Sequence, residues 1–201
     1  MKHLCARLLV IAVLGSLLAS AGCVLNGTDL VIIDQVCVDI EEVQTTGSFS
    51  TFVVANEFKQ QLEKKLAQYG KTKKDVKSIH MVSGSFRSVK VWPHDWNVTA
   101  QIDIARQDVP GGAYNDGPAP FVSFNNQSLK ALKGAPNYPP LAPDGVALVN
   151  RALASLLGGA NPRLVLIVNN ESVTPTPTPS DPMAFTTKAC VVFQVVVGKK
   201  T

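Results

Sequence analysis

The chain has 201 residues, of which 46% are hydrophobic and 17% charged, a composition typical of one globular domain. Its formal net charge is +4, and the sequence contains neither a basic stripe nor a recognisable nucleic-acid-binding module. Nucleic acid is therefore excluded as an expected partner. After residue 22 no window approaches the roughly 18 apolar residues of a membrane-spanning helix, so none is predicted there.

The first 22 residues have the pattern of a secretory signal. Lys2, His3 and Arg7 make a basic start, an apolar run follows over 8–18, and small residues occupy 19–22. Such a run is too short for a standard membrane span and is removed on export. The pattern predicts a signal peptide over 1–22, a short tether over 23–29 and a single globular domain over 30–198.

The stretch Ser20-Ala21-Gly22-Cys23 resembles the lipobox of bacterial lipoproteins, although Ser20 stands where the strict form has Leu. The resemblance implies that Cys23 is acylated, becomes the N-terminus and anchors the protein to a membrane. Because Val24 is not Asp, it also implies an outer-membrane lipoprotein that faces the periplasm or the cell surface. The stretch 19–21 fits ordinary signal cleavage as well, which would release a soluble secreted protein.

The cysteine count distinguishes these two outcomes. The four cysteines are Cys5, Cys23, Cys37 and Cys190, and Cys5 is lost with the signal. Cleavage after Ala21 would leave three cysteines in an oxidising compartment, and one of them would be unpaired. Lipidation of Cys23 would leave two, which can form a disulfide if the first and last strands are neighbours.

Four elements are predicted in the first half of the domain. Residues 30–40 alternate as a strand, and residues 51–69 carry apolar side chains every four positions, as in a helix that ends at Gly70. Residues 75–91 read as a strand pair or a bent strand with Gly84 as a possible bulge. Apolar and polar residues alternate over 97–105, as in a strand with one solvent-exposed face.

The second half is predicted to begin with a loop over 107–120 and a short strand over 121–124. A Pro-rich excursion over 134–143 precedes a helix over 144–157 that Asp144 can cap. Strands over 163–173 and 185–197 end the domain. The tract 174–179 between them alternates Thr and Pro and reads as a stiff, exposed hairpin loop.

These elements form two units of the order β-α-β-β, without matching residues. The pattern predicts an α+β fold in which an antiparallel sheet carries two helices on one face. A β-sandwich with peripheral helices is the alternative.

The chain lacks the motifs of known catalytic, cofactor and metal sites, so no catalytic residue, cofactor or metal is predicted. The one concentrated feature is the segment 91–97, which holds both tryptophans. Trp92, His94, Asp95 and Trp96 are candidate ligand-binding residues, because exposed aromatic rings beside polar groups suit the stacking of sugars. The alternative is that each Trp packs into the core and its N–H finds a carbonyl.

The sequence thus favours a lipid-anchored, non-enzymatic envelope protein that binds or scaffolds another envelope protein or a glycan. The first alternative is an enzyme that acts on glycan or cell-wall substrates through Asp95 or His94. The second alternative is a soluble secreted protein.

Overall fold

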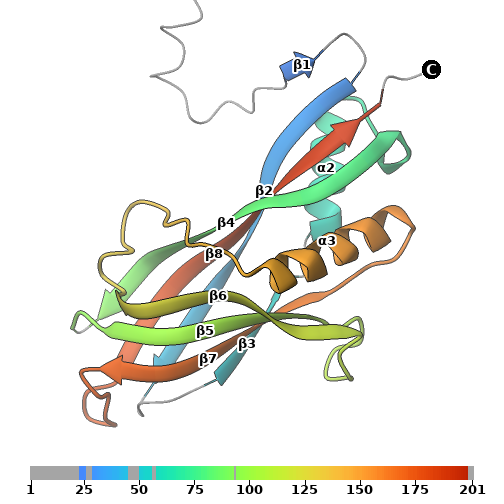
Figure 1. Cartoon of the computed structure of the whole chain (residues 1–201). Coiled ribbons are helices and arrows are strands. Elements are labelled where there is room, and N and C mark those ends of the chain that lie inside the picture. The colour runs from blue at the N-terminus through green and yellow to red at the C-terminus, as the bar shows by residue number, and fades with distance from the viewer. Residues whose placement is uncertain (1–22, 26–28, 45–49, 56–57, 93, 199–201) are drawn as a thin grey trace, which may run out of the picture.

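The computed structural model describes residues 23–25, 29–44, 50–55, 58–92 and 94–198 (Figure 1). The predicted signal over 1–22 lies outside these residues. No helix in the described part of the chain is long and apolar enough to cross a membrane.

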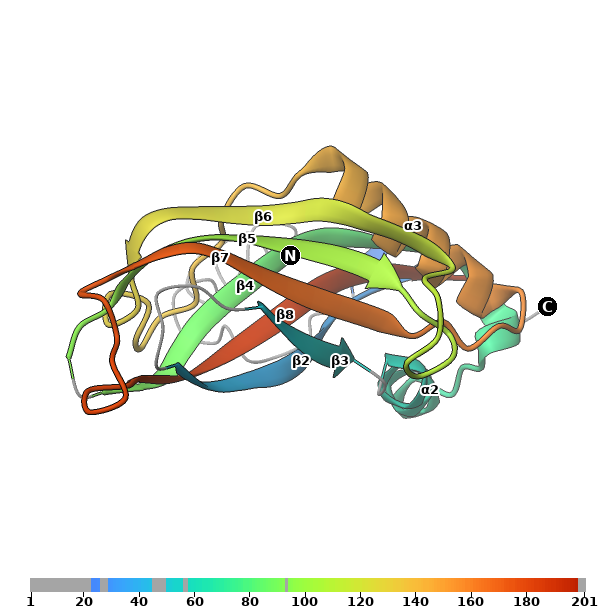
Figure 2. The same ribbon diagram turned by 90° about the horizontal axis from the view of Figure 1, so that it is seen from below.

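Within the described ranges, eight strands form two antiparallel four-stranded sheets. The first has the order β1-β2-β8-β4, which are Cys23–Leu25, Asp29–Gln44, Met183–Val197 and Val76–Trp92. The second has the order β3-β7-β5-β6, which are Ser50–Ala55, Leu164–Thr174, Asn97–Arg106 and Asp116–Ser128. The sheets face each other and diverge toward one end (Figure 1). Helices α2 (Phe58–Gln68) and α3 (Pro143–Leu157) lie at that end (Figure 2). The predicted α+β class is confirmed, with two sheets in place of the single one.

The two predicted β-α-β-β units exchange their last strands. In the first unit β2 and β4 flank β8, which comes from the second unit. In the second unit β6 and β7 flank β5, which comes from the first. Each sheet therefore has a central strand supplied by the other half of the chain, and β1 and β3 are added at the edges.

The predicted helix over 51–69 is wrong in its first part. Residues Ser50–Ala55 form β3, which pairs with β7 along its length, and helix α2 begins at Phe58. The stretch is rich in β-branched and aromatic residues, which favour a strand when a partner strand is present. The rest of the helical stripe is confirmed, because Leu62 and Leu66 are buried.

Strand β4 is one long bent strand, as one of the two readings predicted. Its register against β8 shifts at three places, and Val82 and Val89, which lie at two of these shifts, are exposed. Gly84 is not at a shift, since it pairs regularly with Val191. A side chain there would press on Leu141, so its small size serves close packing.

Three further boundaries differ from the prediction. The strand expected over 121–124 runs from Asp116 to Ser128. Helix α3 begins at Pro143, and Asp144 lies in its first turn because Ala142 occupies the N-cap position. The segment 175–182 is not a hairpin loop, since β7 and β8 belong to different sheets and the segment crosses between them.

Helix α3 bridges the two edge strands β4 and β6. Asn150 Oδ1 accepts a hydrogen bond from the backbone N–H of Met81 on β4, at 2.8 Å. On the other side Arg151 forms a bidentate ion pair with Asp116 of β6, at 2.8 and 3.0 Å. A Cβ at Gly145 would lie only 2.5 Å from the Pro120 carbonyl oxygen, so the close approach of α3 to β6 requires glycine.

The disulfide between Cys37 and Cys190 joins the central pair of strands in the first sheet. The two residues lie directly opposite each other in the fifteen-residue register of β2 and β8. The first and last long strands are thus neighbours, which was the condition for this pairing, and the predicted disulfide is confirmed. It links residues 153 positions apart in the sequence.

The disulfide is expected to contribute strongly to stability. Replacing both residues (Cys37→Ala with Cys190→Ala) should lower the free energy of unfolding by roughly 2–5 kcal/mol, because a long closed loop restricts the unfolded chain. Guanidinium denaturation in a Cys23→Ser background measures this without thiol exchange. Reduction of the parent protein should give the same loss, and an unchanged transition midpoint would contradict the prediction.

Candidate functional site

The predicted ligand-binding segment lies at a corner where the chain passes from the first sheet to the second. Trp92 ends β4 and Asn97 begins β5. The side chain of Trp92 and the whole of Pro93 lie outside the described residues. Trp96 is 0% exposed and belongs to the main hydrophobic core, so its ring is not available for stacking on a sugar. For Trp96 the core alternative therefore holds.

Asp95 holds the corner to the end of β6. Its carboxylate oxygens accept hydrogen bonds from the Ser128 hydroxyl, both at 2.9 Å, and from the backbone N–H of Lys130 at 3.1 Å. The backbone N–H of Leu129 donates to the Trp96 carbonyl at 2.8 Å. These contacts give Asp95 a structural role at this corner.

His94 ties the same corner to the segment that crosses between the sheets. Its Nε2 lies 3.0 Å from an oxygen of Asp181, and both side chains are exposed. The imidazole ring also meets Trp96 edge-on, with ring centroids 5.8 Å apart. Of the four candidates, His94, Asp95 and Trp96 are thus brought together, with His94 and Asp95 at the surface and Trp96 beneath them.

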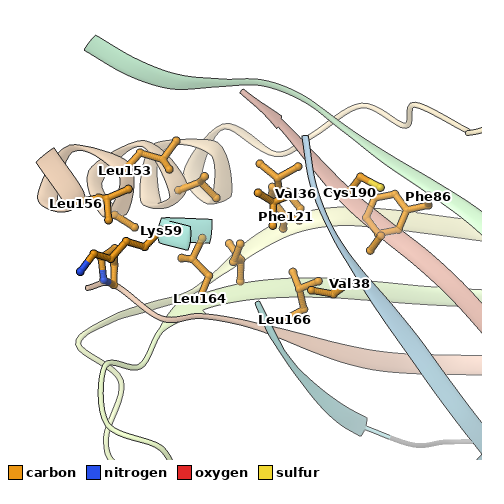
Figure 3. A pocket seen from close by; sticks show the side chains of 16 residues that line it. Val36, Val38, Lys59, Phe86, Phe121, Leu153, Leu156, Leu164, Leu166 and Cys190 are labelled. Atoms are coloured by element: carbon orange, nitrogen blue, oxygen red, sulfur yellow. The ribbon is translucent and has the colours of Figure 1, made fainter. Parts of the chain in front are cut away.

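Two apolar cavities lie between the sheets, and sequence reasoning identified neither. The first, of about 40 Å³, lies under α3 and is lined by Val36, Phe121, Leu153 and Leu166 among others (Figure 3). The second, of about 60 Å³, is lined by residues that include Ile40, Phe124, Leu132 and Val168. Both are smaller than the cavity of about 150 Å³ that accepts benzene.

Phe86 lines both cavities. Its ring packs edge-on against Phe124, with centroids 5.3 Å apart. Phe86 is 2% exposed, and its backbone is held by two hydrogen bonds with Asn137, at 2.9 and 2.8 Å. The two cavities are therefore neighbours, and Phe86 forms part of the wall of each.

The lining of the second cavity includes one polar residue, Thr187. Its hydroxyl is buried and has no hydrogen-bond partner among the described residues. The hydroxyl of its cross-strand neighbour Ser88 is likewise buried and without a partner there. The only sequence signal was that Thr187 interrupts the alternating apolar row of the last strand.

A polar hollow lies on the surface between α2 and β2, with a volume of about 470 Å³. Amide side chains line it, namely Gln35, Gln60, Gln61 and Gln68, together with the charged side chains Asp34, Lys64 and Lys65. Lys65 forms an ion pair with Asp34 at 3.4 Å across it. Because amides both donate and accept hydrogen bonds, this α2–β2 hollow suits a polar partner.

A charged cluster surrounds the start of β6. Arg106 donates to both carboxylate oxygens of Asp108, at 2.8 and 2.6 Å, and Arg163 adds a backbone N–H at 3.3 Å. The hydrogen bonds from Arg106 hold the pKa of Asp108 below its ordinary value. The bidentate pair with Arg151 likewise lowers the pKa of Asp116. Every carboxylate here is matched by a guanidinium, which is typical of a structural cluster.

The described residues contain no group of three His, Cys, Asp or Glu side chains placed to hold a metal ion. No protein-family model matches the sequence, and no curated protein matches it significantly. The function is therefore argued from the residues and their geometry alone.

Thr187→Val tests whether the buried hydroxyl has a partner. Valine has the same shape, so loss of an unpaired buried hydroxyl should leave stability unchanged or raise it by about 1–2 kcal/mol. Chemical denaturation measures the change. The matched control is Thr186→Val, one position away on the opposite side of β8, which should shift stability by at most about 0.5 kcal/mol. A loss near 1 kcal/mol at Thr187 would contradict the prediction.

The Arg106–Asp108 pair should stabilise the fold only above acidic pH. A carboxyl whose folded pKa is lowered contributes fully above its ordinary value of 3.8 and loses that contribution as pH falls through the folded value. The difference in unfolding free energy between the parent and Asp108→Asn should therefore be largest near neutral pH and should disappear in strong acid. Urea melts over a pH series measure it. Arg106→Gln should remove the same pH dependence, and a gap that widens on acidification would refute the assignment.

Proposed function

We propose that the protein is a lipid-anchored, non-enzymatic module of the cell envelope, held at a membrane by an acyl group on Cys23. The observation that carries the proposal is the Cys37–Cys190 disulfide. It occupies two of the three cysteines that follow residue 22, and Cys23 is the third. A disulfide of this kind is typical of an exported protein, in which a lone thiol is uncommon.

The α2–β2 hollow supports the binding part of the proposal. It is open, polar and lined by four glutamines, so it offers many hydrogen-bonding groups to an envelope protein or a glycan. The lipobox-like stretch with Val24 after Cys23 favours the outer membrane as the location.

The alternative of a glycan-acting or wall-acting enzyme has less support. Asp95 uses both carboxylate oxygens to hold Ser128 and Lys130, and His94 pairs with Asp181. Both side chains are therefore already engaged in contacts that hold the corner together. The other alternative, a soluble secreted protein, depends only on the cleavage site.

Intact mass spectrometry of the protein from native membranes tests the anchor. The proposal expects a chain that begins at Cys23 and carries a diacylglyceryl group, with or without an added amide-linked acyl chain. Cys23→Ser should abolish the lipid and, after a wash at high salt, move the protein from the membrane fraction to the soluble fraction.

The matched control is Cys37→Ser with Cys190→Ser, which removes the disulfide and should keep the lipid on Cys23. An unmodified N-terminus at Gly22 would overturn the proposal and favour the secreted alternative.

A further inference from the structure

Cys23 lies at one end of the first sheet. Strand β1 pairs antiparallel with the start of β2, with Cys23 opposite Val31 and Leu25 opposite Asp29. Next to that hairpin, Leu30 pairs with Val197 at the end of β8. Residues 23–25, which the sequence assigned to a free tether, are therefore part of the sheet, and little spacer separates Cys23 from the domain.

Four lysines lie at the same end of the molecule. Lys71, Lys73, Lys74 and Lys77 occupy the turn after α2 and the start of β4, and we call them the basic end (Figure 1). Val76, within this segment, pairs with Val197. Lys71 Nζ donates to the Gly198 carbonyl at 2.9 Å, and Lys77 Nζ lies 2.7 Å from Asp29 Oδ1. These two contacts join the basic end to β8 and to the β1–β2 hairpin.

We propose that the basic end lies against a membrane surface and binds anionic phosphate headgroups, so that the domain is oriented as well as anchored. This inference rests on the proposed acylation of Cys23. The net charge of this end supports the proposal, because its four lysines outnumber its two carboxylates. Asp29 is paired with Lys77, and Asp75 accepts hydrogen bonds from Thr72. Lys73 and Lys74 make no ion pair within the described residues.

The distances suit a two-part attachment. Strand β1 is separated from β4 by three strand spacings of about 4.8 Å each, so the basic end lies roughly 15 Å to the side of Cys23. A membrane surface that runs parallel to this row of strand ends would then meet both the acyl group and the lysines. Each lysine near an anionic surface contributes about 1 kcal/mol to binding, and such a patch reinforces a lipid anchor.

This orientation decides which part of the protein reaches away from the membrane. Strand β2 has 16 residues, so at about 3.3 Å per residue the sheet extends roughly 50 Å from the basic end. The corner with His94 and Asp95 and the crossing segment 175–182 lie at its far end (Figure 1). That far end then points away from the membrane, whereas the α2–β2 hollow lies close to the membrane.

Vesicle binding by the unlipidated Cys23→Ser protein tests the basic end without the anchor. Sedimentation with phosphatidylcholine vesicles, with and without phosphatidylglycerol, should show binding only to the anionic vesicles, and added salt should weaken it. Lys73→Gln with Lys74→Gln should reduce that binding by up to roughly thirtyfold, because two charges are lost. These two lysines are chosen because Lys71 and Lys77 make contacts within the fold.

The matched control is Lys130→Gln with Lys133→Gln, two exposed lysines that lie after β6 near the far end and should leave binding unchanged. Equal binding by the Lys73/Lys74 variant and the parent would overturn the inference. So would displacement by inorganic phosphate but not by chloride at the same ionic strength, since that would indicate a site for free phosphate. The acylation of Cys23 is tested separately by the intact mass of the protein. The proposed anchor and the proposed headgroup binding can therefore fail independently.

Discussion

The pairing of β8 with β2 and β4 is the interaction on which the rest of the structure depends. Strand β8 is the last element of the chain, yet it lies in the centre of the first sheet and pairs with both neighbours along nearly its whole length. The reciprocal arrangement places β5 in the centre of the second sheet. Because each half supplies the central strand of the other sheet, neither half can complete a sheet by itself. The Cys37–Cys190 disulfide covalently links β2 to β8, across a sequence separation of 153 residues.

The edges of the two sheets follow from this arrangement. With β5 and β8 in the centres, β4 and β6 become edge strands, and unpaired edges invite association with other chains. Helix α3 lies between them and bonds to both, through Asn150 to β4 and through Arg151 to β6. The segment 129–142 adds backbone hydrogen bonds to Phe86 and Ser88 of β4. Helix α3 and the segment 129–142 thus cover the side of the two sheets where β4 and β6 are the edge strands.

The same geometry gives the molecule two unlike ends. Near the start of β2 lie Cys23, the basic end and helix α2 with its polar hollow. At the other end lie the corner of His94 and Asp95 and the crossing between the sheets. Among the described residues, the interior between the ends is apolar apart from the buried side chains of Ser85, Ser88 and Thr187. The charged and polar groups described above therefore lie at the two ends, and the apolar interior holds those ends apart.

The sequence by itself determined the elements whose side chains alternate or repeat regularly, which are β2, β5, β8 and the apolar stripe of α2. The cysteine count also predicted a disulfide between Cys37 and Cys190, on the assumption that Cys23 carries a lipid. Only the tertiary structure decided that there are two sheets, that residues 50–55 form a strand, that Trp96 is buried and that Thr187 lines a cavity. The reason is physical, because periodicity shows which face of an element is apolar but not which distant element covers it. For residues 50–55 the partner strand β7 overrode the helical spacing, and at the corner the fold placed Trp96 inside while leaving His94 outside.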